Sequence, residues 1–157
     1  MREIVMNKLM VCVVAVLAMP IGAAYAIDHP PTKEGLWLVR TQTVGNPGGK
    51  KSEDTMKVCR DHASEKAGEA VMRNMKGCTI SNESLSGNVY SLAMHCAIAG
   101  MVIDSKGATT FQSDTAVHSE SHVSYTPAMN GETDQTMISD QTYLGSCPAG
   151  VKPGIVH

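Results

Sequence analysis

The sequence predicts a mainly β domain. We expect an antiparallel meander of about seven strands, forming a curved sheet or a partly open barrel, with one short helix after the second strand. Three observations support this. Short segments with alternating apolar and polar residues, rich in Thr, Ser and Val, recur between Gly, Asn and Pro residues. Helical periodicity is found in one stretch. Two cysteines, Cys78 and Cys96, lie nine residues on either side of Gly87, as expected for a cross-linked hairpin.

The first two strands are predicted at residues 35–44 and 54–59, joined by a loop at residues 45–52. The glycines and lysines of this loop resemble those of a phosphate-binding loop. Their spacing is one residue too short, however, and Lys51 stands where such a loop needs Ser or Thr. We therefore interpret the segment as a mobile hairpin connection.

The helix is predicted at residues 61–75, with Asp61 as its N-cap. Its apolar residues fall near one face, away from its charged residues, and we expect that face to pack on the sheet. These apolar residues are Ala63, Ala67, Ala70, Val71 and Met75.

A hairpin is predicted from residues 78–85 and 89–96, with a three-residue loop at 86–88. In this register Cys78 faces Cys96, Leu85 faces Val89 and the other pairs follow in step. A two-residue loop would place the two sulfurs on opposite faces, because a one-residue slip reverses every side chain. The disulfide and the three-residue loop are thus predicted together.

The rest of the chain predicts three more strands, at residues 107–112, 115–126 and 134–145. Their connections are expected within 100–107, at 113–114 and at 127–132, where Gly, Pro, Asn and Asp gather.

The N-terminal residues 1–26 have the pattern of a cleaved signal peptide. Arg2 and Lys8 precede an apolar run at 9–18, and Ala24-Tyr25-Ala26 forms a cleavage site. The run is too short for a membrane anchor, and no later stretch reaches spanning length. We expect residues 27–157 to form a single disulfide-stabilised β domain in the periplasm or outside the cell, with no membrane span after cleavage.

Removal of the signal peptide takes Cys12 with it and leaves four cysteines. In an exported domain an even number indicates disulfides, and four cysteines allow three pairings. The hairpin favours Cys78–Cys96, which leaves Cys59–Cys147. The absence of a C-x-x-C motif in the sequence argues against a redox or zinc role.

Several short motifs resemble a known family in their order and spacing. They are Gly35-Leu36-Trp37, Val58-Cys59 before the helix, Gly77-Cys78-Thr79-Ile80, the stretch from Ser86-Gly87-Asn88-Val89 to Met94-His95-Cys96, and Leu144-Gly145-Ser146-Cys147. The chain resembles the domain-of-unknown-function 3617 family of small exported bacterial proteins. The resemblance implies a disulfide-bearing β-rich domain and implies no activity.

The sharpest candidate site is His118-Ser119-Glu120-Ser121-His122. In a strand His118, Glu120 and His122 share one face, and their side chains suit zinc or copper. The two histidines are about 13 Å apart along an extended strand, too far for one ion without further ligands. We therefore treat them as weak metal candidates on a wet face, with Val117 and Val123 turned to the core. Trp37, the only tryptophan, is expected to be a core anchor.

The sequence contains no hydrolase, metalloprotease or nucleotide-binding signature, so we expect no enzyme activity and no cofactor. A net charge of −2 and the lack of a basic block argue against nucleic acid. The expected function is a non-enzymatic binding or interaction module for a small apolar ligand or an envelope partner, at residues the sequence does not identify. The alternative is a periplasmic metal-handling protein that uses the His-x-Glu-x-His strand.

Overall fold

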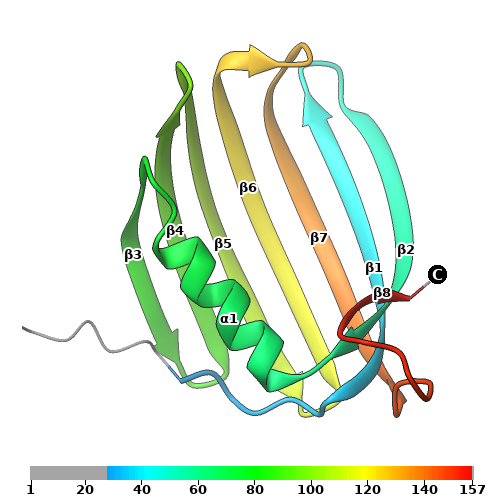
Figure 1. Ribbon diagram of the computed structural model, residues 1–157. Coiled ribbons are helices and arrows are strands. Elements are labelled where there is room, and N and C mark those ends of the chain that lie inside the picture. Colours follow the sequence, from blue (N-terminus) through cyan, green and yellow to red (C-terminus); the bar gives the residue numbers. More distant parts are fainter. Residues whose placement is uncertain (1–27, 157) are drawn as a thin grey trace, which may run out of the picture.

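A computed structural model describes residues 28–156 as one open sheet of eight strands with a single helix (Figure 1). The predicted mainly β class, the antiparallel sheet and the helix after the second strand are confirmed. The predicted signal peptide, residues 1–26, lies outside the described residues. The elements are β1 (Gly35–Asn46), β2 (Lys50–Arg60), α1 (His62–Arg73), β3 (Cys78–Ser86), β4 (Val89–Ile98), β5 (Met101–Ser113), β6 (Ala116–Met129), β7 (Glu132–Gly145) and β8 (Gly154–Val156).

The strand order is β3-β4-β5-β6-β7-β1-β2-β8, and every neighbouring pair is antiparallel. The strands from β3 to β7 form a meander. The first hairpin, β1–β2, then adds to the far side of β7, so the first long strand pairs with the last. The three residues of β8, the strand that the sequence did not predict, pair with the end of β2 at residues 57–59.

The strands are longer than predicted and the connections are shorter. The predicted connection within 100–107 is wrong: the turn is Ala99-Gly100, and β5 starts at Met101. Ala99 and Gly100 both have positive φ, at 52° and 80°, as two-residue hairpin turns require. Likewise β1 and β2 extend through most of the predicted loop at 45–52, so the hairpin connection is shorter than we expected.

The β3–β4 hairpin corrects our argument about the disulfide. Ser86 faces Val89, so the loop has two residues, not three, and Leu85 faces Tyr90. Cys78 nevertheless faces Cys96, because the register shifts by one residue between Ile80 and Asn82. This β-bulge at Ser81 adds the residue that the turn lacks. The two-residue turn and the bulge together therefore bring Cys78 opposite Cys96.

Two disulfides join the cysteines, Cys59 to Cys147 and Cys78 to Cys96. The first ties the end of β2 to the segment after β7, and the second closes the β3–β4 hairpin. No helix in the described part of the chain is long and apolar enough to cross a membrane.

Helix α1 begins after Asp61, whose carboxylate accepts a hydrogen bond from the Ser64 backbone N–H at 2.6 Å, as predicted for an N-cap. Its orientation is the reverse of our expectation. None of its residues is buried, and Val71 is 68% exposed. The helix instead turns charged side chains to the sheet, where Glu65 pairs with Arg60 of β2 and Arg73 pairs with Glu83 of β3.

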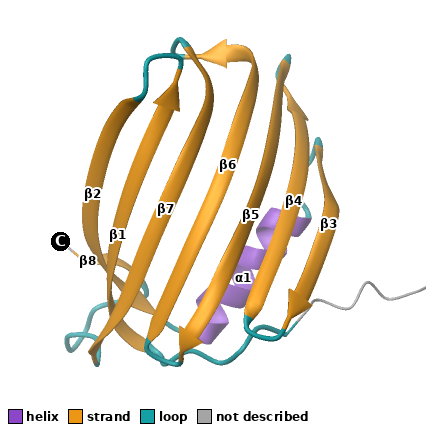
Figure 2. Ribbon diagram, turned by 180° about the vertical axis from the view of Figure 1, so that it is seen from behind, coloured by secondary structure: helices purple, strands orange, loops and turns teal. Residues whose placement is uncertain are grey.

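Helix α1 lies on one face of the curved sheet, which we call the inner face (Figure 1). The opposite, outer face carries no helix (Figure 2). Cross-strand pairing places Trp37, Val117 and Tyr143 on the inner face, together with the residues bonded to α1. Trp37 is fully buried, donates its indole N–H to the Lys33 carbonyl at 2.9 Å and packs edge-on against Tyr143. It is the core anchor that we expected.

Candidate functional site

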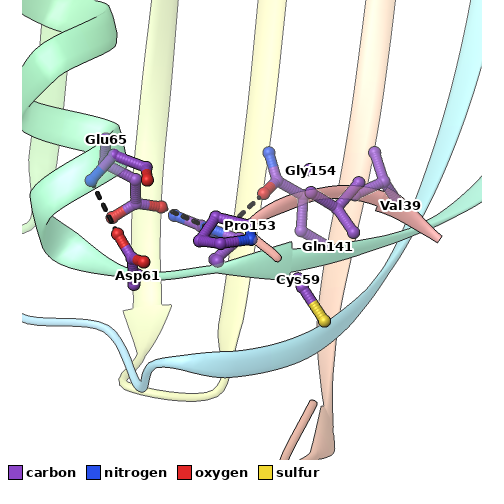
Figure 3. A pocket seen from close by; sticks show the side chains of 10 residues that line it. Val39, Cys59, Asp61, Glu65, Gln141, Pro153 and Gly154 are labelled. Carbon is purple, nitrogen blue, oxygen red and sulfur yellow. Dashed lines mark hydrogen bonds and ion pairs between the residues drawn. The ribbon is translucent and has the colours of Figure 1, made fainter. Parts of the chain in front are cut away.

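The inner face carries an open-sided cavity of about 380 Å³ beside the start of α1 (Figure 3). Asp61 and Glu65 border it on the helix side, and Val39, Gln141 and Gly154 on the side of the sheet. Its size lies within the range of small-molecule pockets. The full lining is Val39, Val58, Cys59, Arg60, Asp61, Ser64, Glu65, Gln141, Pro153 and Gly154.

Local sequence signals place these residues around one space. Strand β2 ends at Arg60 because Asp61 caps the following helix. The Cys59–Cys147 disulfide holds the C-terminal segment against the end of β2, and Pro153 and Gly154 then lead into β8. The cavity is thus formed where two segments far apart in the sequence are cross-linked.

Arg60 organises the polar side of this cavity. Its Nη1 donates to Gln141 Oε1 at 3.0 Å, and its Nε donates to the Glu65 carboxylate. The guanidinium also lies over the Trp37 ring, 4.6 Å from the ring centroid, within cation–π range. The buried Trp37 ring thus packs against the Arg60 guanidinium, and this guanidinium links β2 to β7 and α1.

The rest of the inner face has an apolar surface that the protein covers only in part. Cross-strand pairing places many of the larger apolar residues on this face. Most of them are half-buried. The half-buried ones include Ile80, Leu85, Leu92, Met94, Ile103, Phe111, Val123, Tyr125 and Met137.

A row of hydroxyl side chains crosses the centre of the same face. Thr41, Ser139, Ser119 and Thr109 are successive partners from β1 to β5. The Thr109 and Ser119 hydroxyl oxygens are 3.0 Å apart and share a hydrogen bond. The inner face therefore presents apolar contacts together with hydrogen-bonding groups.

A charged cluster joins the other end of α1 to β3 and β4. Arg73 donates Nη1 to Glu83 Oε2 at 2.9 Å and Nη2 to Glu69 Oε1 at 2.7 Å. The Tyr90 hydroxyl donates to Glu83 Oε1 at 2.7 Å. The hydrogen bonds from Arg73 lower the pKa of Glu83, and burial together with the Glu83 contact raises the pKa of Tyr90. His29, in the segment before β1, packs edge-on against Tyr90, with the two ring centroids 4.2 Å apart.

The outer face carries the predicted His-x-Glu-x-His strand. His118 places Nδ1 2.7 Å from Asp140 Oδ1 and Nε2 3.1 Å from Glu120 Oε1. His122 has a different partner, since its Nε2 lies 3.4 Å from Asp134 Oδ1. The three candidate ligands therefore do not converge. Across residues 28–156 no group of three His, Cys, Asp or Glu side chains is placed to hold one metal ion.

His118 can donate to both carboxylates only when both ring nitrogens carry a proton. Its pKa is raised, chiefly by the hydrogen bond to Asp140 and then by the bond to Glu120. A shallow hollow of about 350 Å³ lies further along the outer face, and its charged lining comes from Asp104, Lys106 and His122. These groups of mixed charge are typical of a solvated sheet face.

Sequence reasoning identified Trp37 and the cysteines but missed Arg60 and Gln141, which lie 81 residues apart and meet across β1. No local motif marks either residue. Only the pairing of β1 with both β2 and β7 brings them together.

A search of curated proteins finds no match to the chain. The profile of the DUF3617 family, described as a protein of unknown function, matches residues 32–147. This range contains the helix, seven of the eight strands and all four cysteines of the disulfides. The chain belongs to the DUF3617 family.

Proposed function

We propose that this protein is an exported, non-enzymatic binding protein whose inner face holds a small apolar ligand. The observation that carries the proposal is the incomplete cover of that face. A sheet normally buries one face against a second layer. Here the second layer is helix α1, which buries none of its residues, and the segment at residues 28–34, which contacts Trp37 and Tyr90 through Lys33 and His29. The large apolar residues buried on the inner face are few.

The chemistry of the inner face favours a ligand with an apolar body and a small polar part. Val39, Val58 and Pro153 supply apolar contacts at the cavity, while Arg60 and Gln141 supply a fixed polar edge. Ligand pockets commonly combine an apolar lining with a few placed polar groups. A ligand that extends along the sheet would next meet the hydroxyl row.

Export is supported by the N-terminal sequence pattern and by the two disulfides, which persist in oxidising compartments. The Cys59–Cys147 cross-link holds the end of β2 at the cavity, and the Cys78–Cys96 cross-link holds the β3–β4 hairpin at the other side of the sheet. The outer-face histidines give no comparable support to a metal-handling role, because they bind separate carboxylates.

The test uses a neutral apolar fluorophore, N-phenyl-naphthylamine, with the exported, disulfide-bonded protein. Trp37 is the only tryptophan and lies next to the cavity through Arg60, so energy transfer from Trp37 reports binding there. We expect saturable binding that Val39→Lys weakens about tenfold or more, since it places a charge in an apolar lining.

Leu38→Lys is the matched control, because Leu38 is the neighbouring residue on the outer face of the same strand. We expect it to leave binding unchanged, with thermal melts confirming that both variants fold. Absence of saturable binding to the wild type, or equal loss in both variants, would refute the proposal.

A further inference from the structure

We propose that α1 is a lid over the inner face, which opens as a unit while the sheet stays intact. This inference rests on the proposed binding function, and it describes how the same site opens and closes. Three independent features of the segment between β2 and β3 support it.

The first feature is the weak packing of the helix. No side chain of α1 is buried, and of its larger apolar residues Val71 is 68% exposed while Met72 is half-buried. Its main contact with a strand is at β3. Segments with few buried apolar contacts open at a lower free energy than the strands of a core.

The second feature is that charged pairs hold the helix at both ends. Arg60 of β2 binds Glu65 near its start, and Glu83 of β3 binds Arg73 at its end. The side chains of both pairs remain between 15% and 37% exposed, so water can compete for them, although the bidentate Arg73–Glu83 pair holds the helix more firmly than an isolated surface pair would. These ion pairs hold the helix in the closed position but allow it to leave that position.

The third feature is the position of the disulfides. Cys59 lies one residue before Arg60, and Cys78 directly follows Gly77, whose φ of +81° favours glycine. Each cysteine is tied to a different part of the sheet, at Cys147 and Cys96. The segment at residues 61–77 can therefore move while β2 and β3 remain anchored on either side of it.

Movement of α1 would remove one wall of the open-sided cavity. Asp61, Ser64 and Glu65 at the start of the helix form its wall opposite the sheet (Figure 3). At the other end, Arg73 and Glu69 lie above Glu83 and Tyr90 of the inner face. Opening thus widens the cavity and uncovers the β3–β4 side of the same face.

Hydrogen exchange of the oxidised, exported protein, followed by mass spectrometry of peptides, tests the lid. We expect the amides of residues 62–73 to exchange at least about tenfold faster than those of β5 and β6. Glu83→Gln removes the charged bond between the sheet and the helix and should accelerate exchange in α1 about tenfold more, with β5 and β6 unchanged.

Glu69→Gln is the matched control, since Glu69 binds the same Arg73 but belongs to the helix itself. It should change exchange in α1 less than about twofold. Exchange of α1 and the sheet at one common rate would overturn the lid. Equal effects of the two variants would also overturn it, because they would indicate fraying of the helix alone. The experiment needs no ligand, so its failure is distinguishable from a failure of the probe-binding test.

Discussion

Removing the disulfides one at a time should show that Cys59–Cys147 stabilises the fold more than Cys78–Cys96 does. The cross-linked residues are 88 apart in the first and 18 apart in the second. In the chain-entropy model these separations correspond to about 4.6 and about 3.2 kcal/mol at 25 °C. The expected difference is therefore about 1.4 kcal/mol.

The two pairs are closely matched in burial, which isolates the effect of loop length. Each joins one buried cysteine, Cys59 at 2% or Cys96 at 4% exposure, to a half-buried one. Replacement of both members of a pair by alanine thus leaves similar cavities. Urea unfolding followed by Trp37 fluorescence measures the free energy of unfolding of each double variant. An equal or larger loss from the hairpin pair would refute the loop-length reasoning.

Three further predictions follow from single positions. His118→Gln should lower stability at about pH 5.5 by less than about 1 kcal/mol, because its carboxylate partners are exposed. Since the folded-state pKa of His118 is raised, this contribution is complete below the unfolded pKa and is lost as pH rises through the folded value, which thermal melts across pH would show. Val117→Ala should cost about 1.5–3 kcal/mol in urea unfolding, because Val117 is buried in the small core. Deletion of Ser81 should preserve the Cys78–Cys96 disulfide in non-reducing peptide maps, because removing the bulge residue keeps both flanking registers.

The sequence predicted the fold class because alternation and turn residues are local signals. It misplaced the turns for the same reason. Ala99-Gly100 is a two-residue turn, and the polar residues that follow it belong to β5 and not to a loop. Polar residues occupy both faces of β5, because its inner face is only partly buried. The alternation of apolar and polar residues that marks a strand is therefore weak in β5. The bulge at Ser81 has no local signal, and it compensates for a turn that is one residue shorter than the three-residue loop that we predicted.

The orientation of α1 could not be predicted, because it depends on partners in distant strands. Amphipathicity alone directs Ala67 and Val71 to the sheet. Glu83 and Arg60 reverse this by offering charged partners to the opposite side of the helix. The candidate cavity was missed for a related reason, since Arg60 and Gln141 meet only through the order of strands.

The small core and the disulfides together explain how an open inner face can be stable. Among the described residues, Trp37, Cys59, Cys96 and Val117 are the buried apolar ones, and two of these four are half-cystines. A core of this size contributes little burial free energy, so cross-links that destabilise the unfolded chain matter more. Apolar residues such as Leu92 and Met137 can then stay half-buried on the inner face without serving the core. The stability of the domain therefore does not depend on burying the surface that we propose binds a ligand. The helix that lies over this surface is held by ion pairs that can open.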